Sequence, residues 1–281
     1  MLKSPLESGI SDYDDNFIDN WQKVIKEYKL SCNEDKMWLL GPSSYIFSIS
    51  GVKFAVDPQI RRRTDFEKIL PTLKKDFEDI SFVLITHQHG DHMCVPLINA
   101  LKDSNIRWYI PAGVRSDYIE KCDFNPEHLI YIKPGYLINE GNLKISTFFS
   151  PHAVGEQPFL QCGFNIGCDK GNIVITGDIR DYSYVYPEFS DVSLCIAHVW
   201  AGRDSIDEEK YLPELERFVK TACLFDAKRY FLCHLYEIGR TPESMWSYKH
   251  AGIAMDMFYS LKPLSTVEVP RVGRSYNIFQ E

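Results

Sequence analysis

The sequence predicts a mixed α/β fold arranged as one domain. Apolar runs of strand length alternate along the 281 residues with stretches whose apolar residues recur at helical spacing. Neither an internal repeat nor a long glycine- and serine-rich linker divides the chain. At 44% hydrophobic residues, the chain can bury a sizeable core. We therefore expect a single domain over residues 1–281, in which 1–35 form a helical N-terminal extension and 241–281 add a final helix and strand.

The N-terminal part should contain one helix followed by antiparallel strands. Residues 13–30 carry an apolar stripe at helical spacing with charged residues between, which predicts a helix that docks on the core. Apolar runs of strand length follow at 37–40, 45–49 and 52–56. A Ser-Gly turn at 50–51 joins the last two, which predicts an antiparallel pair.

The rest of the chain alternates helices and strands. Helices are expected at 66–77, 95–102, 207–222 and 243–260, with another after Pro111. Strands are expected at 80–86, 107–110, 129–132, 143–149, 159–166, 172–176, 192–197 and 230–233. This mixture favours helices that cover sheets within one domain.

The most informative motif is the stretch 87–92, with the sequence HQHGDH. It holds three imidazoles and one carboxylate, and it directly follows the apolar strand expected at 80–86. Imidazole and carboxylate groups are ligands of zinc and related metals, and a loop at a strand end is held by a rigid scaffold. A polar turn whose histidines cluster by chance would also give this sequence, but the density of ligand types argues against it. The motif therefore predicts a metal site, with four candidate ligands: His87, His89, Asp91 and His92.

Further ligand-type residues stand close behind three other expected strands. These residues are His152, Asp178 and His234. Any one of them alone is more often an ordinary polar residue at a strand exit. Their repetition beside the histidine motif favours one shared metal site.

Composition and charge limit the classes of function. The chain has 31 basic and 39 acidic residues and a net charge of −8, which argues against a general nucleic-acid binder. It has no apolar run long enough to cross a membrane, and residues 1–19 are acidic and lack the apolar core of a secretory signal. We therefore expect a cytoplasmic protein with no membrane partner.

The number and spacing of the cysteines also favour the cytoplasm. There are eight, none in a C-x-x-C pair, and a chain of this size does not need disulfides. We expect thiols in a reducing cytoplasm. Cys94 and Cys233 stand beside candidate ligands, which leaves open a thiolate in the site.

Taken together, these residues resemble the pattern of the metallo-β-lactamase fold superfamily of metal-dependent hydrolases. The matching residues are Asp57 after a strand, the motif 87–92, His152, Asp178 and His234. The resemblance spans about residues 36–240, and it implies a four-layer αββα sandwich with the site at one edge of two sheets. The segment from Trp38 to Pro58 looks most like the L-ascorbate-6-phosphate lactonase branch. N-acyl-phosphatidylethanolamine phospholipases D share much of that arrangement.

The resemblance implies two divalent metal ions and a role for each ligand. His87, His89 and His152 would hold the first ion. Asp91, His92 and His234 would hold the second. Asp178 would bridge both, and Asp57 would orient a ligand from behind.

The resemblance also implies a reaction. Two ions about 3.5–4 Å apart can share a hydroxide and polarise the bond that it attacks. Asp91, beside this nucleophile, would accept or transfer a proton. Zinc is the first expectation for histidine-rich ligands, and manganese or iron also suit mixed nitrogen and oxygen ligands.

Several residues outside the ligand set are candidates for contact with the substrate. His198 follows an apolar strand, so it is expected either at the mouth of the site, as a catalytic or substrate-contacting group, or as a structural histidine. Arg61 leaves the strand that ends near Asp57, and arginine binds phosphate and carboxylate well, although a solvated basic turn is the commoner outcome. Arg203 and Tyr236 are candidates that ordinary surface polarity would explain equally well.

The leading hypothesis is a metal-dependent hydrolase that cleaves an ester, lactone or phosphodiester bond in a small anionic molecule. A nucleic-acid phosphodiesterase is the second hypothesis. The net charge disfavours it, and the interval between Asp178 and His234 is too short for a large inserted domain. An iron-dependent redox enzyme and a metal-binding protein without turnover are also compatible with the same ligands. A homo-oligomer is compatible with the sequence.

Overall fold

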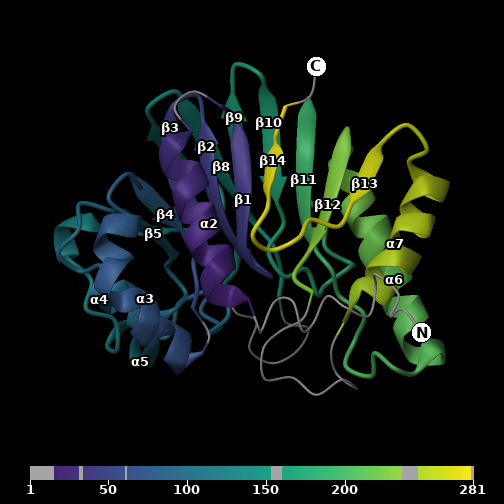
Figure 1. Ribbon diagram of the computed structural model, residues 1–281. Coiled ribbons are helices and arrows are strands. Elements are labelled where there is room, and N and C mark those ends of the chain that lie inside the picture. The colour runs from purple at the N-terminus through teal and green to yellow at the C-terminus, as the bar shows by residue number, and fades with distance from the viewer. Residues whose placement is uncertain (1–15, 32–33, 61, 153–159, 236–245, 280–281) are drawn as a thin grey trace.

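A computed structural model describes residues 1–281 except 1–15, 32–33, 61, 153–159, 236–245 and 280–281. The described chain forms two seven-stranded sheets that pack against each other, with helices on their outer faces (Figure 1). The αββα sandwich implied by the sequence pattern is therefore confirmed.

The first sheet is built mainly from the N-terminal half of the chain. Its strand order is β14-β1-β2-β3-β4-β5-β6. The strands are β1 (Lys36–Gly41), β2 (Ser44–Ile49), β3 (Val52–Val56), β4 (Phe82–Leu84), β5 (Arg107–Pro111), β6 (Leu129–Ile132) and β14 (Ser275–Asn277). The pairs β1·β2 and β2·β3 are antiparallel, the second as the turn at 50–51 predicts, and β3 to β6 run parallel.

The second sheet is built from the C-terminal half. Its strand order is β13-β12-β11-β10-β9-β8-β7. The strands are β7 (Leu137–Glu140), β8 (Leu143–Phe149), β9 (Cys162–Cys168), β10 (Gly171–Ile175), β11 (Val192–His198), β12 (Arg229–Cys233) and β13 (Thr266–Glu268). Strands β7 to β10 are antiparallel neighbours, whereas β10 to β13 run parallel.

The apolar core between the sheets draws side chains from both of them. The rings of Phe47, Phe54 and Phe82 stack in sequence across the first sheet, with centroids 4.9 and 4.8 Å apart. Phe164 and Phe231 from the second sheet belong to the same buried cluster. Each such ring contributes about 1.5–3 kcal/mol by leaving water, so this layer stabilises the packing of the two sheets against each other.

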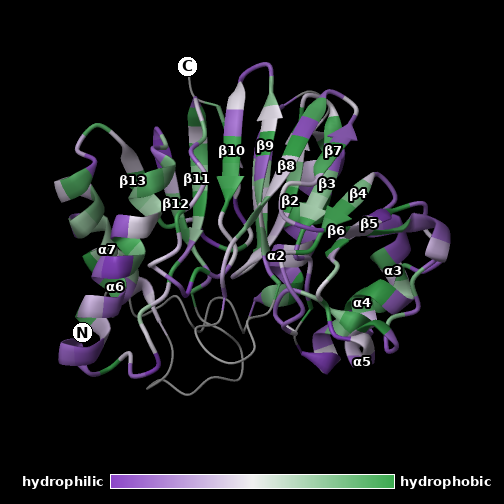
Figure 2. Ribbon diagram, turned by 180° about the vertical axis from the view of Figure 1, so that it is seen from behind, coloured by the Kyte–Doolittle hydropathy of each residue, from purple (hydrophilic) through white to green (hydrophobic). Residues whose placement is uncertain are grey.

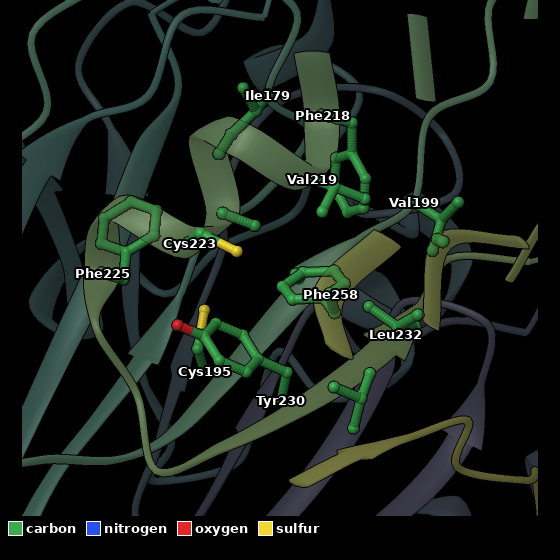
Figure 3. Packing of buried hydrophobic residues seen from close by; sticks show 14 of the residues in the cluster. Ile179, Cys195, Val199, Phe218, Val219, Cys223, Phe225, Tyr230, Leu232 and Phe258 are labelled. Atoms are coloured by element: carbon green, nitrogen blue, oxygen red, sulfur yellow. The ribbon is translucent and has the colours of Figure 1, made fainter. Parts of the chain in front are cut away.

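Helices bury their apolar stripes on the outer faces of both sheets. The first sheet is covered by α2 (Phe17–Leu30), α3 (Arg63–Asp76), α4 (Val95–Ala100) and α5 (Ser116–Ile119), with a short 3-10 turn at Pro126–His128. The second is covered by α6 (Glu208–Ala222), a 3-10 turn at Cys223–Phe225, and α7 (Tyr248–Leu261). Figure 3 shows Phe218 of α6 and Phe258 of α7 packed near Tyr230 and Leu232 of β12. The hydropathy colouring shows the same division, with apolar strands inside and mixed helices outside (Figure 2).

The structure corrects several expected elements. Strand β7 has no counterpart among the expected strands, because Leu137 and Asn139 are exposed on an edge strand whose apolar signal is weak. The expected C-terminal helix and strand are a helix and two short strands, which join different sheets.

Several expected boundaries also move by a few residues, among them those of α3, which is Arg63–Asp76, and β4, which is Phe82–Leu84. The strand expected at 159–166 is β9, and its first expected residue lies outside the described residues. The helix expected from 243 begins at Tyr248, because the Ser247 hydroxyl accepts a hydrogen bond from the Lys249 N–H and caps the helix there. Among the described helices, none has the length and apolar character needed to cross a membrane.

The topology brings several strand ends to one edge of the sandwich. In the first sheet β3 and β4 run parallel, and in the second sheet β10, β11 and β12 run parallel. Strand β8 shares the direction of β10, because both are antiparallel to β9. Residues just after these strands are therefore expected to meet at that edge.

Candidate metal centre

The seven candidate ligands meet at this edge in three overlapping groups. Within each group the ligand atoms lie within 4.8 Å of one another. The groups are His87–His89–His152, His87–His92–Asp178 and Asp91–His92–His234. Residues from four separate strand ends thus form one cluster of imidazoles and carboxylates.

The first group consists of three imidazoles. His152 Nε2 lies 2.9 Å from His89 Nδ1, and the rings of His87 and His152 have centroids 4.6 Å apart. The Nε2 atom of His87 is buried and has no hydrogen-bond partner within the part of the chain that the structure describes. A buried nitrogen without a partner is costly unless a ligand satisfies it. A metal ion fits this position.

The group of Asp91, His92 and His234 joins two imidazoles and a carboxylate. His234 Nε2 lies 3.3 Å from both His92 Nε2 and Asp91 Oδ2. Asp178 stands beside this group, because its carboxylate oxygens are 3.5 Å from His92 Nε2 and from His234 Nε2. Asp178 also groups with His87, so it lies between the two sets of ligands.

The electrostatics of the cluster suit a cation. Burial lowers the pKa of His87 and of His89, and it lowers the pKa of His152 to about 3, so these imidazoles are neutral at pH 7. Burial opposes ionisation of Asp178, but nearby positive charge, with His234 and Arg180 foremost, holds its pKa well below the usual range. Neutral imidazole and ionised carboxylate are the forms that bind metals.

The raised pKa of His92 shows that the cluster stabilises a positive charge. Burial alone would lower its pKa, but Asp178, Asp91 and Asp57 together raise it to about 10. A proton on His92 therefore balances the carboxylates when no other cation does so. A divalent ion would supply this charge instead and leave the imidazole neutral.

Asp57 contacts His92 on the side away from the other ligands, the position that the resemblance implies. Its carboxylate accepts hydrogen bonds from the Thr86 N–H at 2.7 Å, the Thr86 hydroxyl at 2.6 Å and His92 Nδ1 at 2.7 Å. Because Nδ1 of His92 donates to Asp57, its Nε2 faces the cluster. Asp57 adopts φ 46°, in the left-handed region that aspartate and asparagine tolerate better than most residues.

His198 does not lie at the mouth of the site. It is fully buried, with Nδ1 2.9 Å from Asp178 Oδ1 and Nε2 2.9 Å from the Tyr45 hydroxyl. Both ring nitrogens are therefore engaged inside the protein. These contacts match the structural alternative for His198 and place its ring against Asp178.

Arg180 completes the surroundings of Asp178, and sequence reasoning missed it. Its Nη2 donates to Asp178 Oδ2 at 2.9 Å, and its guanidinium lies 3.8 Å from the centroid of the Trp200 ring. The side chain is 8% exposed. The one signal in the sequence is that Arg180 stands two residues after Asp178. This spacing does not fix its direction, because a short loop can turn such a side chain toward Asp178 or away from it.

Two further side chains support the ligands. Gln161 accepts a hydrogen bond from the Asp178 N–H at 3.0 Å. Gly177, between β10 and Asp178, has φ 61°, and a Cβ there would come within 2.9 Å of the Gln161 side chain. Trp246 stacks on the His234 ring and donates its indole N–H to the His234 carbonyl. These partners pack against the segments that carry Asp178 and His234.

The remaining candidate residues from the sequence lie outside the metal-ligand cluster or outside the described residues. Arg61 and Tyr236 lie outside the described residues. Arg203 is exposed. Burial raises the pKa of Cys233 to about 12, so its thiol is neutral, and Cys94 is buried near the Ile60 carbonyl. None of the seven cysteines that the structure describes forms a disulfide.

Comparisons with known proteins match this chain both by sequence and by fold. A family model described as a beta-lactamase superfamily domain matches residues 53–235. The solved structure of a metallo hydrolase from the hyperthermophilic archaeon Ignicoccus hospitalis superposes with a TM-score of 0.56 and 17% identity, covering 86% of this chain and 97% of that one. At this identity the likeness concerns the fold.

Two curated relatives match over part of their length. N-acyl-phosphatidylethanolamine-hydrolyzing phospholipase D 1 of Caenorhabditis elegans is 28% identical over 86 residues, which are 27% of this chain and 24% of that protein. A UPF0173 protein of Pyrococcus abyssi is 25% identical over 154 residues, which are 54% of this chain and 62% of that protein. Both alignments leave more than a third of the relative unmatched.

Proposed function

The chain belongs to the metallo-β-lactamase superfamily of metal-dependent hydrolases, and we propose that it uses two divalent ions to cleave an ester, lactone or phosphodiester bond in a small anionic substrate. The family match covers the segment from β3 to His234, which contains every candidate ligand.

One observation carries the dinuclear proposal: Asp178 lies between two sets of ligands. Three imidazoles stand on one side, and Asp91, His92 and His234 stand on the other. A carboxylate with one neighbour on each side can hold two ions at the short separation of dinuclear hydrolytic sites. A single ion with about four protein ligands would use only part of this seven-residue set.

Each residue of the site would have its own role in the reaction. Bound ions would acidify a water molecule and polarise the scissile bond. Asp91, whose side chain is 15% exposed, is the most accessible carboxylate of the cluster and would accept or transfer the proton. Asp57 and His198 would hold His92 and Asp178 in place. Burial around the ligands would strengthen each of these interactions.

Ligand chemistry supports zinc as the first expectation. The first set consists entirely of imidazole nitrogens, and the second mixes nitrogen with carboxylate oxygen. Manganese and iron fit the mixed set. The resemblance to the lactonase-like branch supports manganese, and the matched segment of a phospholipase D supports a phosphodiester among the candidate bonds.

The test is elemental analysis of gently purified protein, followed by hydrolysis assays with the metal found. About two equivalents of zinc or manganese per chain, with turnover of a lactone, an aryl ester or bis(4-nitrophenyl) phosphate, is the expected result. Two equivalents of iron with oxygen consumption would replace the hydrolase with a redox enzyme. Cleavage restricted to RNA or single-stranded DNA would favour a nuclease. No metal, before or after reconstitution, would contradict the proposal.

A further inference from the structure

A cavity of about 420 Å³ lies beside the metal-ligand cluster and has His234 in its wall. Its volume is within the range of pockets that hold small molecules. The wall is assembled from the start of α2, the end of β1, the end of β12, the start of α7 and the segment before β14. Its lining residues include Leu39, Pro42, Leu232, Leu235 and Val272 on the apolar side, and Asn16, Asp19, Asn20, Arg271 and Arg274 on the polar side.

The cavity and the metal-ligand cluster are separated by very little protein. The His234 N–H donates to the Pro42 carbonyl at 2.7 Å, and both residues line the cavity. The next residue, Ser43, donates from its hydroxyl to the Asp91 carbonyl at 2.8 Å. A molecule that fills the cavity would therefore contact His234, one of the candidate metal ligands.

The two arginines in the wall are unusual for this protein. Neither Arg271 nor Arg274 forms an ion pair with any carboxylate in the described part of the chain. Of the eight other described arginines, all except Arg203 do: Arg62, Arg63, Arg107, Arg115, Arg180, Arg217 and Arg229. Two guanidinium groups against the single carboxylate of Asp19 leave an excess of positive charge in the wall. Guanidinium groups suit phosphate and carboxylate oxygens.

The backbone that carries these arginines is held firmly. The Gly273 N–H donates to the Leu39 carbonyl at 2.8 Å, and the Leu39 N–H donates to the Arg274 carbonyl at 3.2 Å. Gly273 has φ 78°, and a Cβ there would come within 2.3 Å of the Asn20 side chain, so the segment packs closely on α2. The Arg271 guanidinium also lies 4.8 Å from the centroid of the Tyr248 ring. Both arginine side chains are exposed, so this packing fixes the point at which each leaves the backbone.

We propose that this cavity binds the non-reacting end of the substrate, an apolar body that carries a phosphate or carboxylate group recognised by Arg271 and Arg274. This inference rests on the proposed hydrolase function. It assigns recognition of the anion to the C-terminal segment, whereas the metal-ligand cluster performs the cleavage. The apolar lining would hold the body of the molecule by excluding water.

The first test is binding, because it does not depend on turnover. Phenyl phosphate and phenylacetate are titrated calorimetrically into the metal-loaded protein, with benzyl alcohol as the neutral probe. We expect either anion to bind and the alcohol not to bind. The double variant Arg271→Gln/Arg274→Gln should weaken binding about tenfold or more, as expected when charged hydrogen bonds are lost. Arg217→Gln, an exposed arginine of α6, is the matched control and should bind as the unaltered protein does.

The same titration of the variant His89→Ala tests whether the anion binds at the metals instead of in the cavity. His89→Ala should retain affinity for the probe if the cavity holds it. Affinity that is lost in His89→Ala and unchanged in the double arginine variant would overturn the proposal, as would the absence of binding by either anion. The two probes also distinguish a phosphate from a carboxylate as the recognised group.

Kinetics separate this inference from the proposed function. With any ester that the protein hydrolyses, the double arginine variant should raise KM for a substrate with a remote anionic group and leave kcat nearly unchanged. A neutral ester with the same reacting group should be unaffected. An equal KM increase for both esters would overturn the recognition role. Anion binding without turnover of any ester would contradict the proposed function and, with it, the substrate role of the cavity.

Discussion

His198 Nδ1 lies 2.9 Å from Asp178 Oδ1, and both side chains are buried. Burial lowers the pKa of His198 to about 4, so the ring is neutral and carries one proton. With Nδ1 donating to Asp178, Nε2 accepts the hydrogen bond from the Tyr45 hydroxyl at 2.9 Å. Tyr45, His198 and Asp178 thus form a buried chain that ends at the metal-ligand cluster.

This chain predicts that His198→Ala weakens metal binding about 10- to 100-fold, the usual cost of losing a residue that orients a ligand. His198→Asn, which can still donate to Asp178, should recover part of the affinity. Tyr45→Phe removes a more distant link and should have a smaller effect. Competition with a chromophoric chelator measures all three. Unchanged affinity in His198→Ala would show that Asp178 is held without it.

His89→Ala should abolish hydrolysis and lower the metal content from about two equivalents per chain to about one. The first set would keep two imidazoles, which bind a metal weakly, whereas the second set would remain complete. Elemental analysis and circular dichroism check content and fold together. The matched control is His128→Ala, a half-buried histidine outside the cluster. Full activity of metal-replete His89→Ala would refute the ligand assignment.

Asp57→Asn should lower metal affinity by about 10- to 100-fold without unfolding the protein. Asparagine tolerates the positive φ of this position but removes the charge that holds His92 Nδ1. Asp226→Asn is a matched control, because Asp226 has φ 47° and lies on the surface near Lys262. Metal titration and thermal unfolding of both variants separate the loss of charge from backbone effects. Equal affinity in the two variants would argue against a role for Asp57.

His250 should make stability depend on pH. Its Nδ1 accepts from the Ser247 N–H at 2.9 Å and its Nε2 lies 2.6 Å from the Ser205 carbonyl, so the folded state holds the neutral ring. Burial lowers its pKa below the ordinary 6.5. As pH falls below 6.5, the unfolded state therefore binds the proton first, and the free energy of unfolding decreases. Above this pH the contribution of His250 is complete.

The variant His250→Gln isolates this contribution. It should destabilise the protein by about 1 kcal/mol at neutral pH, the usual value of a helix cap. The difference from the unaltered protein should shrink as pH falls toward about 5, where the free ring is protonated. Urea unfolding across this range measures it. A difference that stays constant with pH would mean that His250 contributes packing rather than a neutral hydrogen-bonding ring.

Local patterns in the sequence are sufficient for most elements of the fold. The strands around Tyr45 and Phe54 and the amphipathic helices follow from apolar spacing, because each pattern depends on near neighbours alone. Strand β7 and the two short C-terminal strands do not follow from such spacing. The short C-terminal strands form through pairing with partners distant in the chain, such as Lys36 for Asn277 and Arg229 for Thr266.

The sequence by itself determined which ligand types this protein carries and that each stands at a strand end, because side-chain chemistry and apolar periodicity are local properties. The tertiary structure alone decided the direction of each side chain. It turned His198 inward against Asp178, brought Arg180 to the same carboxylate and set Arg271 in the wall of a cavity beside His234. These positions depend on how parallel strands from two sheets align and how loops pack between them, and no local pattern encodes such contacts between distant segments.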